Sequence, residues 1–412
     1  MKLEYFISKR LATSNEYKSS VSAPIIKIAI VAIAISIIMM LVSVSTGFGL
    51  QEKIRDKITS FNGHLTILNY DNNQSEITTV PLSLQQDFYP NFKNVPEVSK
   101  IQPFATIAGV VRTPETFEGI VYKGVSSDYD FNFISEYLKE GKLPQFSNDG
   151  MSNEILISDY LARRLKLKVG DKMQTYFMKD SGNKMPYIRS FEIVGIYDSG
   201  FKEFDETYVI GDLKHVQRLN KWDENEVGAF EIYVNDFTKI NEINTKIYED
   251  IPSDLNSISI TDKYFGIFEW MKLFDFNIYM IIGIMIIVAS INMIVALLVL
   301  ILERTQMIGI LKALGANNWT IRKIFLLNAT HIVFRGLIWG NIIGLSILLL
   351  QKYFGIIKLD PTQYYVAEAP VYLNLYYILG LNAMVILLCY IILIIPSYMI
   401  TKISPVKAIK YQ

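Results

Sequence analysis

The residues best suited to chemistry are three histidines and one cysteine, because imidazole and thiolate groups serve as metal ligands, bases and nucleophiles. His64, His215 and His331 are far apart in the sequence, and none belongs to an HExxH or CxxC spacing. Cys389 is the only cysteine and lies inside an apolar run, so an internal disulfide is impossible. We therefore assign no catalytic residue and no metal ligand.

Nucleotide-binding and hydrolase motifs are absent as well. The sequence has no GxxxxGK[ST] phosphate-binding loop and no GxSxG nucleophile elbow. We expect the chain itself to bind no ATP and no other cofactor. Its 40 basic residues balance 40 acidic ones, which argues against nucleic-acid binding, and 51% of its 412 residues are hydrophobic. This composition indicates a membrane protein.

Four apolar stretches are each long enough to cross a bilayer, for which about 18 residues are needed. They comprise residues 24–50, 273–302, 324–350 and 376–400. The first could be taken for a cleaved signal peptide with Ala32 and Ala34 near the cleavage site. Its apolar run continues well past Ala34, so we interpret it as a membrane anchor.

The flanking positive charges predict the orientation of these spans. Lysine and arginine are concentrated in the N-terminal arm 1–23, in the connection 303–323 and in the tail 401–412, whereas the loop 351–375 has only Lys352 and Lys358. Since positive charge favours the cytoplasmic side, both termini should be cytoplasmic. Residues 51–272 should then form one large domain on the other side of the membrane.

This large domain has the pattern of a mixed α+β fold. Four alternating runs are typical of strands: 64–70, 119–125, 191–197 and 229–234. Three segments have helical spacing: 158–167, 211–219 and 237–248. The predicted fold is a multi-pass α-helical membrane protein with four transmembrane helices and a large α+β extracytoplasmic domain between the first and second spans.

A polar, turn-rich segment interrupts the strand pattern of the domain and suggests a protruding hairpin. Its candidate residues are Lys179, Asp180, Gly182, Asn183, Met185 and Pro186. The segment could be an ordinary surface loop or a contact for a soluble partner.

The connection between the second and third spans has an apolar stripe. Met307, Ile310, Leu311 and Leu314 fall at i, i+3, i+4 and i+7, which predicts a short amphipathic helix. Gly315 should end this helix in the left-handed conformation, and Asn317 or Asn318 should cap the next one. The segment could simply reverse the chain at the membrane surface, or it could dock into a groove on a partner.

The third span contains glycines at four-residue spacing, Gly336, Gly340 and Gly344, which form a strip where another helix backbone can approach closely. We expect this strip to serve helix packing, and a second permease chain to lie against it. Arg335 lies beside the strip. Its charge requires either a protein-facing or water-facing position, or a side chain that snorkels to the membrane surface.

Several segments together resemble a known family of membrane permeases. The run from Glu303 to Ala316 resembles the coupling helix of the FtsX-like and MacB-type ABC transporter permease superfamily. Further segments resemble the LolC and LolE lipoprotein-releasing permeases of that superfamily: 6–11, 46–48, 63–67, 191–200, 369–373, 395–397 and 403–409. The segment after Pro396 departs from the family pattern, with Ser397 and Tyr398 in place of alanine and arginine.

The resemblance implies that the coupling helix docks into a groove on a separate ATPase subunit. The coupling residues would be Glu303, Arg304, Met307, Ile308, Gly309, Ile310, Leu311, Lys312, Leu314, Gly315 and Ala316. The ATPase would be similar to LolD and would carry the ATP and Mg.

The implied assembly is a bacterial inner-membrane complex of two permeases, identical or different, and two ATPase subunits. It would extract lipoproteins and pass them to a periplasmic carrier. The chain could be the LolC-like partner, the LolE-like partner or a single permease in both roles. Two alternatives are an FtsX- or MacB-type permease that acts mechanically on a wall hydrolase or efflux component, and a membrane-anchored binding protein without an ATPase.

Overall fold

The computed structural model describes residues 22–72, 75–147, 150–178 and 185–403. The chain divides into two compact units. The helical unit comprises Met1–Gln51, Trp270–Leu359 and Glu368–Gln412, and the α+β unit comprises Glu52–Glu269 and Asp360–Ala367.

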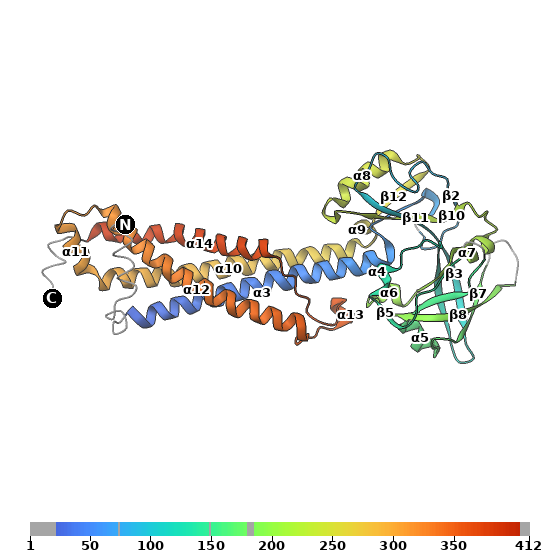
Figure 1. Ribbon diagram of the computed structural model, residues 1–412, viewed down its shortest axis with the longest axis horizontal. Helices are drawn as coiled ribbons and strands as arrows, with labels where there is room; N and C mark the ends of the chain where they lie inside the picture. The colour runs from blue at the N-terminus through green and yellow to red at the C-terminus, as the bar shows by residue number, and fades with distance from the viewer. Residues whose placement is uncertain (1–21, 73–74, 148–149, 179–184, 404–412) are drawn as a thin grey trace. The chain divides into compact units, whose positions relative to one another are not determined.

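Four long helices make up most of the helical unit and lie side by side (Figure 1). They are α3 (Ser22–Asn62), α10 (Phe265–Glu303), α12 (Asn318–Phe354) and α14 (Leu375–Ser397). Two short helices, α11 (Thr305–Ala313) and α15 (Met399–Lys402), follow α10 and α14. By length and composition, four candidate spans are found among the described residues, so the predicted multi-pass architecture is confirmed.

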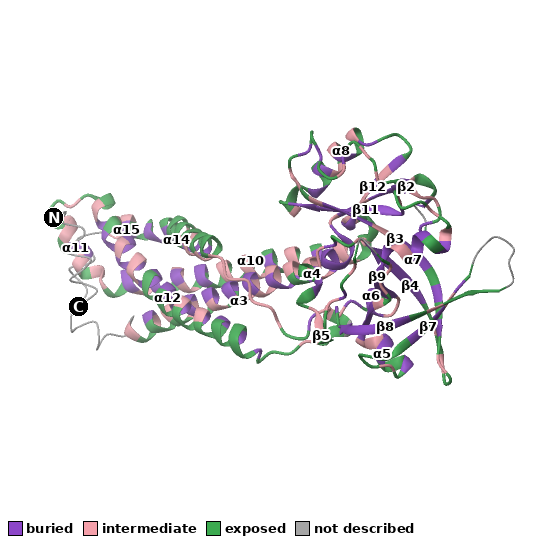
Figure 2. Cartoon of the chain, turned by 45° about the vertical axis from the view of Figure 1, so that its right-hand side comes forward, coloured by how far each residue is buried: buried purple, intermediate pink, exposed green. Residues whose placement is uncertain are grey.

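The core of the helical unit consists of aliphatic and aromatic side chains from all four long helices. Ile37 of α3, Met293 of α10 and Phe325 of α12 are completely buried, and Leu393 of α14 nearly so. Exposed apolar residues also follow the outer sides of these helices (Figure 2). Apolar residues on all sides of a helix are typical of a membrane span.

The α+β unit is built on one ten-stranded sheet of described strands, in the order β12-β1-β11-β3-β4-β9-β6-β8-β5, with β7 paired to β3 and β8. The strands are β1 (Leu65–Asn69), β3 (Val98–Arg112), β4 (Phe117–Val125), β5 (Leu138–Gly141), β6 (Glu154–Ser158), β7 (Lys172–Phe177), β8 (Tyr187–Tyr197), β9 (Tyr208–Asp212), β11 (Ala229–Val234) and β12 (Leu255–Ser259). A separate pair joins β2 (Leu82–Ser83) to β10 (Glu226–Val227).

Most neighbouring strands are antiparallel, whereas β4 pairs with β9 and β6 pairs with β8 in parallel. The helices and single turns of this unit are α4 (Asn132–Ser135), α5 (Asp159–Leu165), α6 (Lys202–Asp205), α7 (Leu213–Asn220), α8 (Ile240–Asp250), α9 (Ile260–Lys263), α13 (Pro361–Tyr364), η1 (Tyr70–Asn72) and η2 (Phe237–Lys239). Mixed pairing and intervening helices confirm the predicted α+β class.

All four predicted strands and all three predicted helices of this unit correspond to observed elements. Ser158 caps α5 by accepting a hydrogen bond from the Leu161 N–H, as expected for serine at this position. The longest strand, β3, was not predicted, because it contains Pro103 and an early stretch of mixed polarity.

The loop between α12 and α14 does not belong to one unit. Its residues 360–367 group with the α+β unit, although the whole of 351–375 was expected to be a short connection between two spans. The Lys57 ammonium donates a hydrogen bond of 2.8 Å to the Tyr365 carbonyl, and the rings of Phe201 and Tyr365 are 5.7 Å apart. These contacts fix the loop within the α+β unit.

Candidate functional site

The elbow, residues 303–323, connects α10 to α12 through α11. Gly315 has φ +87°, and its N–H and that of Ala316 bond to the carbonyls of Lys312 and Leu311 at 3.0 and 2.9 Å. This is the double hydrogen bond by which a left-handed glycine ends a helix. Asn317 then accepts a hydrogen bond from the Trp319 N–H at the start of α12. The predicted helix stop and helix cap are both confirmed.

The apolar stripe of α11 is only partly exposed. Met307 and Leu311 are half-buried and pack against the apolar core of the helical unit, whereas Ile310 is 47% and Leu314 79% exposed. Ile308, which lies outside the stripe, is fully buried. Four residues at i, i+4, i+7 and i+8 are exposed: Gln306, Ile310, Ala313 and Leu314. We call these four residues the outer face of α11.

The other coupling candidates fall on both sides of the elbow. Glu303 and Gly315 are exposed, and Arg304 and Ala316 are half-buried. Gly309 is buried. Spacing identifies an apolar side of the helix, but it does not show that the chain's own spans cover half of that side.

Two cations of the elbow bind the C-terminal part of the chain. The Lys312 Nζ donates to the carbonyls of Ile400, Thr401 and Ile403 at 2.7, 3.3 and 2.8 Å. Partial burial lowers the pKa of the Lys312 ammonium. Sequence reasoning gave no signal for this contact, since it joins residues about 90 positions apart.

Arg322 makes the second of these contacts. Its Nε donates to the Ser397 hydroxyl at 3.0 Å, and its Nη2 donates to the Ile394 carbonyl at 3.2 Å. The guanidinium also lies over the rings of Trp319 and Tyr398, at 5.2 and 5.6 Å from their centroids. The start of α12 is thereby fastened to the end of α14.

The glycine strip of α12 faces α3 of the same chain. A Cβ atom at Gly336 would lie 2.7 Å from the Ile33 Cβ, and one at Gly340 would lie 2.8 Å from the Ile37 Cβ. At Gly344 the nearest atom is the Leu41 Cδ1, at 3.1 Å. The close helix approach is present, but the expectation that a second permease chain lies against this strip is wrong, because α3 covers it.

Arg335 is exposed on the outer side of α12. The next residue, Gly336, contacts Ile33, which is six residues and therefore about 9 Å beyond Lys27 along α3. Side chains on a helix tilt towards its N-terminus, which for α12 is the end at the elbow. This placement favours the snorkelling alternative for Arg335.

A further polar contact inside the spans was missed by sequence reasoning. The amide of Asn341 donates to the Asn382 side-chain oxygen at 2.7 Å, and Asn382 returns the bond at 3.0 Å. The signal in the sequence was a polar amide inside each of the two apolar stretches 324–350 and 376–400, although the first of them contains Asn328 as well as Asn341. The pair joins α12 to α14.

The predicted hairpin is formed by β7 and β8, which pair antiparallel up to Phe177 opposite Tyr187. Met185 is 82% exposed and Pro186 is also exposed. The remaining candidate residues of the tip lie outside the described residues: Lys179, Asp180, Gly182 and Asn183. Contact with a soluble partner stays a prediction.

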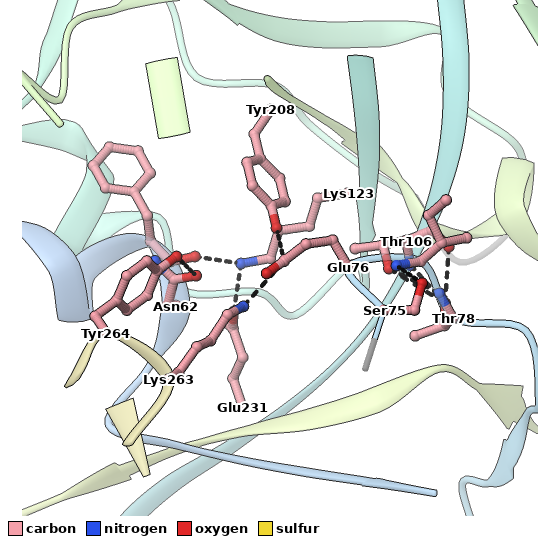
Figure 3. A network of polar contacts seen from close by, with 12 residues as sticks. Asn62, Ser75, Glu76, Thr78, Thr106, Lys123, Tyr208, Glu231, Lys263 and Tyr264 are labelled. Atoms are coloured by element: carbon pink, nitrogen blue, oxygen red, sulfur yellow. Dashed lines mark hydrogen bonds and ion pairs between the residues drawn. The ribbon is translucent and has the colours of Figure 1, made fainter. Parts of the chain in front are cut away.

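The α+β unit contains a buried polar network at the end of α3 (Figure 3). Lys123 and Glu231, which are 2% and 1% exposed, form an ion pair, and the Lys123 Nζ also donates to the Phe61 carbonyl at 2.6 Å. Burial lowers the pKa of the Lys123 ammonium, and the adjacent Glu231 carboxylate opposes this change. The pair thus fastens the last turn of α3 to β4 and β11.

The same network reaches the segment just before α10. The Tyr264 hydroxyl donates to the Asn62 side chain at 3.2 Å, and Lys263 pairs with Glu76 at 3.1 Å. A cavity of about 400 Å³ is lined by these charged groups and by Thr66, Phe104 and Ile258. Each of the charged groups bonds to another residue of the chain, so the network has a structural explanation.

No group of three or more His, Cys, Asp or Glu side chains suited to a metal ion occurs among the described residues. The elbow presents the exposed side chains of Ile310 and Leu314 on one side, and on the other it makes hydrogen bonds to the segment 394–403. Four apolar helices and a large α+β unit define the chain as a multi-pass membrane protein with an extracytoplasmic domain.

Comparison with known families agrees with this class. Residues 28–247 match the MacB-like periplasmic core domain, and residues 279–405 match the FtsX-like permease C-terminal family. The chain therefore belongs to the FtsX-like permeases that carry a MacB-like periplasmic core domain. Such a protein is a transporter component rather than a catalytic enzyme.

Individual relatives are distant in sequence but similar in extent. The lipoprotein-releasing system transmembrane protein LolE of Haemophilus influenzae is 20% identical, over 85% of this chain and 83% of that protein. LolC of Xylella fastidiosa is 19% identical, over 93% of both chains. The periplasmic region of MacB from Actinobacillus actinomycetemcomitans is 14% identical, covers 53% of this chain and 97% of its own, and superimposes with a TM-score of 0.34.

Proposed function

We propose that the chain is the permease subunit of an ABC transporter that extracts lipoproteins from the inner membrane for delivery to the outer membrane. The outer face of α11 carries this proposal, since Ile310 and Leu314 are exposed at helical spacing on a connection between two spans. The names of the full-length relatives, lipoprotein-releasing system transmembrane proteins, supply the cargo.

The proposed partners follow from the absence of a phosphate-binding loop in the sequence. A separate ABC ATPase similar to LolD would bind ATP and Mg and receive the outer face of α11. A second permease chain would complete the cavity for the cargo, because the four described spans pack their apolar side chains against one another around a common core. A periplasmic carrier would accept the lipoprotein.

The proposed topology places the elbow and both termini in the cytoplasm and the α+β unit in the periplasm, in agreement with the positive charges of the elbow. A reporter fused after Gln412 should indicate the cytoplasm, and one inserted at Asn183 should indicate the periplasm. The opposite pair of signals would refute the topology and with it the ATPase contact.

The proposed mechanism needs no covalent chemistry on this chain. When ATP closes the ATPase subunits, α11 moves with them and displaces α12, which begins only five residues after α11 ends. Because α12 packs on α3 through its glycines, the first span moves with the third. Paired movements in two permeases would close the lipid-facing cavity and expel the cargo.

Purification of the complex from native membranes tests the proposal against its alternatives. An ATPase together with a trapped acylated protein supports lipoprotein extraction, and ATP-dependent transfer of that protein to a soluble carrier completes the demonstration. An ATPase together with a wall hydrolase or an efflux component would indicate mechanical transmission instead. Neither kind of partner would indicate a membrane-anchored binding protein.

A further inference from the structure

The main-chain carbonyls around α15 receive an unusual number of bonds from one side chain. Ile400, Thr401 and Ile403 lie in and just after the last turn of this helix, and all three accept hydrogen bonds from the Lys312 Nζ at 2.7 to 3.3 Å. Carbonyls at a helix C-terminus have no partner within the helix, and a cation there is favourable. Lys312 therefore supplies hydrogen-bond donors to the carbonyls at the end of α15.

A second cation acts in the same way one helix earlier. The Tyr398 N–H bonds to the Ile395 carbonyl, which leaves the Ile394 carbonyl to side-chain donors. Arg322 is one of these donors, and the Ser397 hydroxyl, which Arg322 also contacts, is the other. We call Lys312, Arg322 and their acceptors in residues 394–403 the carbonyl clasp.

The clasp lies on a different side of α11 from its outer face. Ile310 and Leu314 are exposed, whereas Lys312, between them in sequence, is half-buried and holds the C-terminal segment. Successive residues on a helix point in different directions, about 100° apart, so one short helix can contact two bodies at once. A displacement applied to the outer face would reach residues 400–403 through Lys312.

We propose that the carbonyl clasp makes the fourth span move with α11, so that the ATPase drives α14 through Lys312 as well as α12 through the chain itself. Lys312 is then a positioning residue for energy coupling, and this role rests on the proposed function. Without Lys312, α11 would still bind the ATPase and still displace α12. The C-terminal segment would lose its direct attachment to α11 and would follow only through the contacts of α12 with α14.

Lys312→Met tests the clasp because methionine keeps the length and apolar stem of lysine but donates no hydrogen bond. Lys312→Arg restores a cationic donor. Lys323→Met is the matched control, since Lys323 is exposed on the same elbow and lies 5.7 Å from the Trp319 ring. Each variant would be purified as the full complex and reconstituted with the ATPase that copurifies with it.

The measured quantity is the amount of lipoprotein released per ATP hydrolysed. Lys312→Met should retain its ATPase subunit but release at least fivefold less per ATP, whereas Lys312→Arg and Lys323→Met should remain within twofold of wild type. Amide hydrogen exchange in residues 399–403 should increase in Lys312→Met alone. A purely structural contact would change exchange but leave the ratio unchanged.

If Lys312→Met released as much lipoprotein per ATP as wild type, the proposed role of the clasp would be refuted. Loss of the ATPase subunit from this variant would also refute it, because Lys312 would then serve docking. If wild type itself released no lipoprotein, the proposed function would fail separately. The clasp would then be judged from the permease-dependent stimulation of ATP hydrolysis. Equal stimulation in Lys312→Met and wild type would overturn it.

Discussion

Truncating both exposed apolar residues of α11, as Ile310→Ala with Leu314→Ala, should weaken binding of the ATPase subunit by roughly 60-fold. Complete burial of an isoleucine or leucine is worth roughly 2 kcal/mol. With 47% of Ile310 and 79% of Leu314 exposed and available for burial, the two contribute about 1 and about 1.6 kcal/mol. Their sum of about 2.5 kcal/mol corresponds to this change in affinity at 1.4 kcal/mol per tenfold.

The assay is a titration of purified permease in lipid nanodiscs with the fluorescently labelled ATPase subunit. Phe117→Ala is the matched control, because Phe117 is 72% exposed but belongs to the α+β unit, and this variant should bind with wild-type affinity. Wild-type affinity in the double variant would refute the docking role of the outer face. Substitutions of Gly309 or Leu311 cannot test docking, because both residues pack within the chain itself.

Three further substitutions test the packing and the charges of the two units. Gly340→Leu should destabilise the helical unit by about 1–3 kcal/mol through overpacking against α3, whereas Gly380→Leu, which meets open space, should not; thermal unfolding in detergent compares them. Lys123→Met should cost about 3–5 kcal/mol by leaving Glu231 buried without its partner, and adding Glu231→Leu should recover most of the loss in chemical unfolding. Burial raises the pKa of Asp205 from 3.8 to about 6, so the folded state binds a proton more tightly than the unfolded state. The unfolding free energy of wild type relative to Asp205→Asn should therefore fall as the pH rises from about 4 to about 6, and a rise would contradict this reasoning.

Sequence reasoning succeeded where the signal is local. Gly315 ends α11 because a left-handed residue is needed there and glycine adopts that conformation without strain. Asn317 caps α12 because its side chain reaches the N–H two residues later. The four spans followed in the same way from the length of their apolar runs.

Sequence reasoning failed to identify which segment of the chain packs against a surface that it had recognised. The glycines of α12 predict that some backbone approaches closely, but only the folded chain shows that α3 is the one that does. Ile308 of α11 is fully buried, although it lies outside the periodic stripe. The contacts of Lys312 and Arg322 join segments more than 70 residues apart. Most of their acceptors are main-chain carbonyls, which every residue has, so the residue types do not mark them.

The glycine strip also restricts which internal motions the chain can make. The side chains of Ile33 and Ile37 pack into the spaces that the missing side chains of Gly336 and Gly340 leave in the surface of α12. Sliding α12 along α3 would move both isoleucines away from these glycines and against larger side chains. The next glycine of the strip lies four residues, or about 6 Å, farther along the helix. A small rotation of the two helices together would keep the contacts of Ile33 with Gly336 and of Ile37 with Gly340. This packing therefore opposes axial sliding of α12 along α3, so we expect a displacement applied at the elbow to reach α3 as well.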